Sequence, residues 1–401
     1  MSTLAADRFG SDARATAVPA ARSWQRLSER SLRAAVALWF GITAAGQLIF
    51  AFTIASFYGV TAARGYFTSW NRSMTHGYVP GDAPGNVVVA LHLASAVFII
   101  LSGTAQITPW VRNNFRTFHR WNGRLYLVSA FSVSLAGLYM MLVRGTVGGT
   151  LAHVGQGIDA GLIMVCAVLA ARHAMAGDYS THRRWALRLY LVVSASLFVR
   201  AGAFLAGMLT DPDTVLTVMS FAQYVVPLTV LEMYLRVRPA SAVAHRFAVA
   251  GTLAVCTGVL ALGLVGATAG KWRPDLRAAF DSRRPIGGVL SETIARHGID
   301  EAARQYRDVK LSGDASYNME ETQLNTLGYQ LMRAGSLPAA IRVFQLNVEA
   351  FPESSNTYDS LGEAYMNAGD RANAVANYQE SLRLNPRNSN GAMMLRKLTS
   401  P

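Results

Sequence analysis

The sequence predicts an all-α protein: a seven-helix transmembrane bundle followed by a soluble α-helical module. Apolar residues make up 51% of the 401 residues and charged residues only 15%, a balance too apolar for an ordinary soluble protein. After residue 270 the long apolar runs stop, and the chain becomes rich in Asn, Glu, Arg and Ala. The change in composition indicates two regions of different kind.

Seven apolar segments are long enough to cross a membrane as helices, because about 20 such residues span its hydrocarbon core. They are 32–58, 87–108, 125–143, 151–175, 187–209, 215–235 and 247–269. The first lacks a small-residue cleavage signature, which indicates a retained anchor and not a signal peptide. We therefore expect four parts: a disordered cytoplasmic arm (1–30), a seven-span domain (31–270), a linker with helical segments (271–320) and a repeat region (321–401).

The net charge of +13 is concentrated in the membrane part. Residues 1–270 hold 21 Arg against 9 Asp and Glu, and the arginines gather in the N-terminal arm and in alternate connections between spans. Arg144 stands alone in a connection on the other side. This is the positive-inside pattern. It predicts a bacterial inner-membrane protein with a cytoplasmic N-terminus and a periplasmic tail, and it argues against a nucleic-acid partner.

The tail repeats itself with a period of 34 residues. Glycines at 328 and 335 recur at 362 and 369, Ala340 recurs at 374, an aromatic at 344 recurs at 378, and a proline at 352 recurs at 386. This is the tetratricopeptide (TPR) pattern, with residues 390–398 as a capping helix. The tail also resembles TPR tails of some bacterial serine hydrolases, although no SxxK or GxSxG motif accompanies it. A TPR groove within 321–398 implies a periplasmic protein or peptide as partner.

Two oppositely charged residues lie at matching depth on neighbouring predicted spans. Asp159 and Arg200 are each roughly 12–14 Å from the same membrane face, at about 1.5 Å per residue. Because charges within a membrane are costly unless paired, we expect an intramembrane ion pair. The alternative for these two residues is a proton or ligand site, as in a small-solute or lipid transporter.

Four histidines lie on the four central spans, one pair near each membrane surface. His92 and His153 are near the outer face, and His119 and His182 open spans at the inner face within "HRWNGRLYL" and "HRRWALRLYL". This arrangement resembles that of dihaem b-type transmembrane cytochromes, in which imidazoles from alternate helices hold two haems. That resemblance implies haem b, the four histidines as ligands, and a transmembrane oxidoreductase. A hydrogen-bonded core histidine is the alternative for His92.

The same two motifs favour a second interpretation, which is contact with lipid headgroups or phosphate at a helix entrance. The arginines concerned are Arg120, Arg124, Arg183, Arg184 and Arg188. Residues 86–210, with "LHLASAVFIILSGTAQ" and both motifs, also resemble a family of predicted bacterial multi-pass membrane proteins of unknown function. The sequence thus favours a membrane protein whose TPR module binds a partner, with a b-haem electron carrier and a transporter as alternatives.

Overall fold

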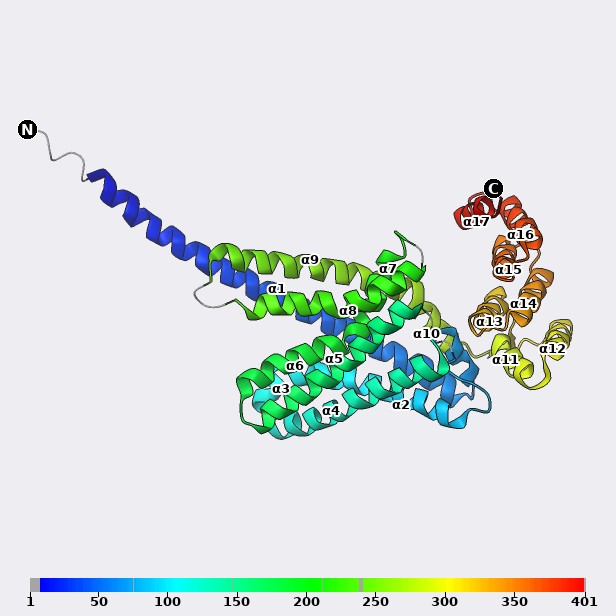
Figure 1. The fold of residues 1–401 in the computed structure, drawn as a ribbon, viewed down its shortest axis with the longest axis horizontal. Helices are drawn as coiled ribbons and strands as arrows, with labels where there is room; N and C mark the ends of the chain where they lie inside the picture. Colours follow the sequence, from blue (N-terminus) through cyan, green and yellow to red (C-terminus); the bar gives the residue numbers. More distant parts are fainter. Residues whose placement is uncertain (1–7, 75, 147, 211, 238–240, 400–401) are drawn as a thin grey trace, which may run out of the picture. The chain divides into compact units, whose positions relative to one another are not determined.

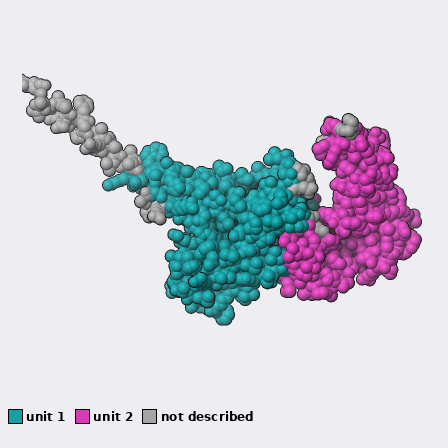
Figure 2. Space-filling view, viewed as in Figure 1, with its two compact units in different colours: residues 1–54, 94–138, 148–274 teal, residues 55–93, 139–147, 275–401 magenta. Residues whose placement is uncertain are grey.

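The computed structural model describes the chain except residues 1–7, 75, 147, 211, 238–240 and 400–401 (Figure 1). The side chains of residues 8–21, 212–213 and 389 also lie outside the description. Nearly every described element is a helix, so the predicted all-α class is confirmed. The chain forms two compact units, which Figure 2 colours separately. Unit 1 comprises residues 1–54, 94–138 and 148–274, and unit 2 comprises residues 55–93, 139–147 and 275–401.

The apolar part of the chain forms the long helices, together with a short helix and two π-helical turns. They are α1 (Arg8–Ala63), α2 (Ala83–Ile107), α3 (Pro109–Asn114), α4 (Arg116–Tyr139), the π-helical turn η2 (Met140–Arg144), α5 (Thr150–Met175), α6 (Tyr179–Val193), α7 (Ala195–Ala206), α8 (Pro212–Leu235), α9 (Val243–Ala267) and the π-helical turn η3 (Thr268–Trp272). Six helices in the described residues are long and apolar enough to cross a membrane, and a bent pair makes up to seven. The prediction of about seven spans is therefore confirmed.

The bent pair is α6 and α7, which the sequence predicted as one straight span. The two helices meet at an angle of 45°. At the break, the hydroxyl of Ser194 donates a hydrogen bond to the carbonyl of Tyr190 at 2.7 Å. A serine that bonds back to the preceding turn loosens the backbone ladder and bends a helix. The fifth apolar segment is thus two helices and not one.

Unit 1 is held by small shared cores between its helices. Leu32 and Ala35 of α1 pack with Val230 of α8 and Val249 of α9. A second cluster joins α6 to α8 through Tyr190, Leu191 and Leu231. Many remaining large apolar side chains of these helices are exposed, such as Val265 of α9 at 68%. Such exposure is expected of a bundle whose solvent is lipid.

The chain after residue 272 forms shorter helices. They are α10 (Arg273–Phe280), α11 (Ile286–His297), α12 (Ile299–Ser312), α13 (Glu321–Arg333), α14 (Leu337–Ala350), α15 (Ser355–Asn367), α16 (Arg371–Leu384) and α17 (Ser389–Thr399). A two-residue parallel ladder pairs β1 (Arg284–Pro285) with β2 (Tyr317–Asn318). Consecutive helices from α13 to α17 stack on one another in turn (Figure 1), and the pair α11–α12 packs on this stack through contacts of α11 with α13 and of α12 with α14. The helical TPR region is therefore confirmed.

The 34-residue period has a direct structural basis. Gly335 and Gly369 end the first helix of their pairs with φ of 78° and 77°, a left-handed conformation that glycine adopts without strain. Gly328 and Gly362 lie against the rings of Phe344 and Tyr378, where a side chain would fill the helix crossing. Both rings are fully buried. Each repeated residue thus serves either the turn or the crossing of its own helix pair.

Residues before 321 are part of the same stack. Ile286 and Leu290 of α11 and Tyr306 of α12 share one core with Leu324 and Leu327 of α13. The helix pair α11–α12 therefore precedes the two repeats as a packed layer. The predicted four-part division of the chain, including a disordered arm over 1–30 and a linker over 271–320, stays a prediction.

Candidate functional site

A basic cavity of about 570 Å³ lies in unit 1, among α1, α6, α8 and α9. Its lining is Glu29, Leu32, Arg33, Ser180, Arg183, Arg184, Leu187, Tyr234, Leu235, Val237 and Arg246. The lining brings together four guanidinium groups and one carboxylate, beside a wall of aliphatic and aromatic side chains. These residues come from positions up to 217 apart in the chain.

Arg246 is the most buried charge of the cavity, with 4% of its surface exposed. Its Nη1 donates a hydrogen bond to Oε1 of Glu29 at 3.2 Å, and this glutamate is half exposed. A buried charge is costly unless an opposite charge or dipole compensates it, and Glu29 supplies the opposite charge here. The contact therefore joins the first turns of α9 to α1. Arg33 lies one turn after Glu29 on the same helix, and its Nε donates to the Glu29 carbonyl.

The N-terminus of α6 positions the other two arginines. Asp178 caps this helix, because its carboxylate accepts the Thr181 amide hydrogen bond at 3.1 Å. Hydrogen bonds from Thr181 lower the pKa of Asp178 to about 2. Arg183 and Arg184 follow in the next turn, and both are exposed at the cavity.

The other arginines of the predicted headgroup set lie elsewhere. Arg188 donates to the carboxylate of Glu232 on α8 at 2.7–2.8 Å, and its guanidinium stacks 4.6 Å from the centre of the Trp185 ring. Arg124 stacks in the same way on Trp121, at 4.7 Å. Arg120, also on α4, is exposed. Of the predicted arginines, only Arg183 and Arg184 line the cavity, so the full headgroup set stays a prediction.

The motif "HRWNG" on α4 binds the neighbouring helix α2. Asn122 is buried, and its Nδ2 donates to the Ser102 carbonyl at 3.1 Å and to Oε1 of Gln106 at 2.9 Å. Nε2 of Gln106 donates to the carbonyl of His119. Gly123 makes room for this amide, since a Cβ there would lie 2.6 Å from Nε2 of Gln106. These contacts give the motif a structural role between α2 and α4.

The structure brings two of the four predicted haem ligands near each other. His119 and His182 are close enough to interact electrostatically. Nδ1 of His182 lies 2.8 Å from the Ala170 carbonyl, while Nδ1 of His119 is buried without a hydrogen-bond partner. His92 is half-buried on α2 in unit 2 and His153 half-buried on α5 in unit 1. Haem ligation by these residues stays a prediction.

The predicted intramembrane pair is not brought together in the described residues. Oδ1 of Asp159 is buried without a hydrogen-bond partner. Arg200 is exposed, donates to the Ser196 carbonyl at 2.7 Å and lies 4.6 Å over the ring of Phe50. Equal depth along two helices does not fix the direction in which each side chain points, and here the bend before α7 intervenes. Arg200 instead packs against α1.

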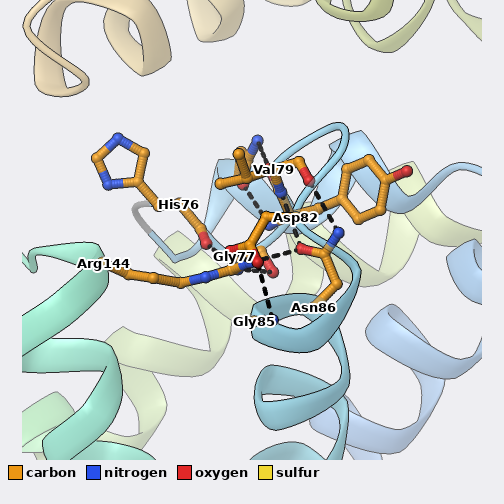
Figure 3. Close-up of polar contacts among 9 residues, drawn as sticks. His76, Gly77, Val79, Asp82, Gly85, Asn86 and Arg144 are labelled. Atoms are coloured by element: carbon orange, nitrogen blue, oxygen red, sulfur yellow. Dashed lines mark hydrogen bonds and ion pairs between the residues drawn. The ribbon is translucent and has the colours of Figure 1, made fainter.

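A second arginine site, in unit 2, was not foreseen from the sequence. Arg144, at the end of η2, is buried and reaches the loop before α2 (Figure 3). Its guanidinium donates to the His76 carbonyl at 2.7 Å, to Oδ1 of Asn86 at 2.8 Å and to Oδ2 of Asp82 at 2.6 Å. The hydrogen bond from Arg144 lowers the pKa of Asp82 below its ordinary value. Asn86 in turn pairs with both backbone groups of Val79.

The loop that Arg144 holds carries the short helix η1 (Phe67–Arg72), which packs on α11 and α13 within unit 2. Arg72 and Ser73 bind the carboxylate of Asp275, which is 4% exposed, at 3.1 and 2.9 Å. At the end of α1, Nη1 of Arg64 donates to the carbonyls of Ala279 and Asp281. Polar contacts thus join α10 and the turn after it to η1 and to Arg64, the residue that follows α1, all within unit 2.

The first helices of successive repeats, α13, α15 and α17, are bridged by a row of polar contacts. The hydroxyl of Tyr329 donates to Oε2 of Glu363 at 2.8 Å. Asn356 donates to Glu321 at 2.8 Å. Asp359 accepts amide hydrogen bonds from Asn388 and Asn390 of the last helix and the turn before it, at 2.8 and 3.0 Å. Burial and the nearby Glu363 carboxylate raise the pKa of Tyr329 far above its usual range, so its hydroxyl stays a donor.

Comparison with known proteins agrees with these two regions. Residues 89–235 match the family model described as "Predicted membrane protein (DUF2306)", and residues 355–388 match the tetratricopeptide repeat model. A stretch of 63 residues is 43% identical to the "Cellulose synthase operon protein C" of Escherichia coli (strain K12) and to the putative protein of that name from Escherichia coli O157:H7. The match covers 16% of this chain and only 5–6% of those relatives.

None of these matches supports the resemblance to dihaem cytochromes. The resemblance to a family of multi-pass membrane proteins and the presence of a TPR tail are both confirmed. The chain therefore carries a membrane region of the DUF2306 type together with a C-terminal tetratricopeptide repeat.

Proposed function

We propose that this protein is a membrane-anchored recruiter whose TPR groove, within residues 321–398, binds a segment of a partner protein. The observation that carries the proposal is the polar row along α13, α15 and α17. Stacked helix pairs bury their apolar faces on each other and leave an extended surface for binding. Here that surface is lined by groups with remaining capacity to accept or donate hydrogen bonds.

The chemistry of the row favours a cationic partner segment. Glu321, Asp359 and Glu363 supply three carboxylates along it, and each carboxylate has about four acceptor positions. The contacts described above occupy only part of that capacity. Lysine, arginine or backbone N–H groups of a partner would fill the remainder, and charge-assisted hydrogen bonds of this kind are the stronger ones.

The membrane part would serve as an anchor that presents the groove at a membrane surface. The contacts of η1 with α11 and α13 support this role, because they join the TPR stack to the loop between α1 and α2. We propose that the anchor lies in a bacterial inner membrane, with the N-terminus cytoplasmic and the TPR region periplasmic. The arginine-rich alternate connections support this orientation.

The relatives named for a cellulose synthase operon match this chain over a short stretch only. That match supports a repeat architecture in common. The experiment that tests the proposal is therefore partner capture by position. A photo-crosslinking amino acid would replace Asn356, exposed on α15 and facing α13, in the full-length protein in cells. The matched control is Gln379, which is exposed on the second helix of the same repeat.

We expect discrete adducts of one protein at position 356 and none at position 379. Charge reversal by Glu363→Lys should abolish the adduct at 356, since it removes the carboxylate at the centre of the row. Equal adducts at both positions, or adducts at 356 that persist in the Glu363→Lys background, would contradict a groove-bound partner.

A further inference from the structure

The basic cavity of unit 1 is not used by the function proposed above. We infer that it binds the phosphate head of an anionic amphiphile, such as a phospholipid. The inference rests on the shape, charge and lining of the cavity, and it does not depend on the TPR groove.

The charge of the cavity favours an anion. Of its four arginines, Arg246 is paired with the one carboxylate, Glu29, and Arg33, Arg183 and Arg184 add positive charge around it. In the described part of the chain, no carboxylate forms an ion pair with Arg183 or Arg184. Guanidinium groups present several donors in a plane and bind phosphate oxygens in pairs. A phosphate group is therefore the ligand chemistry that fits.

The remaining lining favours an amphiphile over a soluble anion. Leu32, Leu187 and Leu235 line the cavity beside the arginines, with Tyr234 and Val237. A small hydrated anion would leave these side chains exposed to water. The first methylene groups of an acyl chain would instead cover them, and the burial of apolar surface would stabilise the complex. The volume of about 570 Å³ falls in the range of ligand-binding pockets.

The position of the cavity agrees with an amphiphilic ligand. It lies at the ends of α6, α8 and α9 and beside the middle of α1, where arginine-rich segments meet apolar ones: Arg33 opens the apolar run of α1, and Arg184 is followed by the apolar residues of α6. Such boundaries coincide with the level of lipid phosphates. A phospholipid could therefore enter with its head among the arginines and its chains along the bundle.

The test uses full-length protein, delipidated in detergent and examined by native mass spectrometry with equal amounts of dioleoyl phosphatidylglycerol and dioleoyl phosphatidylcholine. We expect one tightly retained phosphatidylglycerol. The variant Arg183→Gln/Arg184→Gln should weaken its binding by roughly tenfold for each arginine, the value of one charge-assisted hydrogen bond. Both residues are exposed, so the variant should fold.

The matched control is Arg120→Gln/Arg124→Gln, which removes the same charge from α4 outside the cavity. It should retain phosphatidylglycerol as the unmodified protein does. A second variant, Leu187→Trp, fills the cavity at unchanged charge and should also lose the lipid. Thermal unfolding of each variant checks that its fold is kept.

Three results would overturn the inference. Equal losses in the cavity and control variants would indicate general attraction to a basic surface. Equal retention of the two lipids would remove the charge selectivity. Finally, calorimetric binding of inorganic phosphate that depends on Arg183 and Arg184 and is not displaced by phosphatidylglycerol would assign the cavity to a soluble anion.

Discussion

Replacing Arg144 by methionine should release the loop before α2. The change removes four hydrogen bonds that the buried guanidinium donates, to the carbonyls of His76 and Gly77 and to the side chains of Asp82 and Asn86. Those to the His76 carbonyl and to Asn86 are short, at 2.7 and 2.8 Å. A hydrogen bond from a charged donor contributes about 1.5 kcal/mol or more. The two together give about 3 kcal/mol, or roughly a hundredfold in the opening equilibrium of the loop. The contact with Asp82 is left out of this sum because water reaches that carboxylate.

Hydrogen–deuterium exchange of the Val79 amide measures this opening directly, because its N–H is bonded to Oδ1 of Asn86 at 3.0 Å. We expect its protection to fall about a hundredfold in Arg144→Met, and to be unchanged in Arg296→Met, an exposed arginine of α11. Gly85→Ala should lower the protection of the Val79 amide in the same way without removing a charge, since the added Cβ would overlap the Asp82 carboxylate. Unchanged protection of Val79 in Arg144→Met would refute the role of Arg144.

The same site should make the loop sensitive to acid. Arg144 lowers the pKa of Asp82 in the folded protein below the ordinary value of 3.8. A carboxylate of this kind adds stability above that value, and the contribution is lost as the pH falls below it. After correction for intrinsic exchange, protection of Val79 should therefore decrease below about pH 4 in the natural sequence. In Arg144→Met this decrease should be smaller, because the hydrogen bond from the Gly85 amide then remains to lower the pKa of Asp82. A decrease of equal size in both proteins would point to another group.

The two repeats and the turn after α10 offer two further predictions. Gly328→Ala should destabilise α13 and α14 by about 1–2 kcal/mol, the cost of overpacking less the gain in helix propensity, because its Cβ would lie 2.5 Å from the Phe344 ring. Gly362→Ala, with 3.3 Å to the corresponding ring, should be near neutral, and equal effects in denaturant unfolding would contradict this comparison. Asp281→Asn should reduce the decrease in the free energy of unfolding that acid causes, since the hydrogen bond from Arg283 lowers the pKa of Asp281 in the folded protein. An unchanged decrease with falling pH would show that the pair adds no stability.

The parts of the fold that the sequence predicted are those encoded by local periodicity. A 34-residue period places both glycine turns and both aromatic crossings of the TPR region, because each repeat folds mainly on its neighbours. Apolar length alone predicts the spans. The bend between α6 and α7 was missed because a hydropathy window averages over the whole apolar segment and carries no signal for a break in the helix.

The contacts that the sequence could not predict are those between distant segments. Arg72 and Asp275 are 203 positions apart, and Glu29 and Arg246 are 217 apart. No spacing rule connects such residues, so the cavity could be predicted only through the two arginines that are adjacent in sequence. Arg144 stands alone in the connection between the third and fourth predicted spans. This isolation was the one signal in the sequence that pointed to a buried, hydrogen-bonded arginine.

The two similar motifs show how a repeated sequence acquires different roles. In both copies, the tryptophan and the arginine three residues later stack at nearly the same distance, 4.7 Å on α4 and 4.6 Å on α6. The copy on α4 has Asn122 and Gly123 after its tryptophan, and these residues bind α2. The copy on α6 lacks both, and its arginines line a cavity instead. Comparing charge removal in the two copies therefore separates the proposed anion site from the headgroup contact that the sequence predicts for both copies.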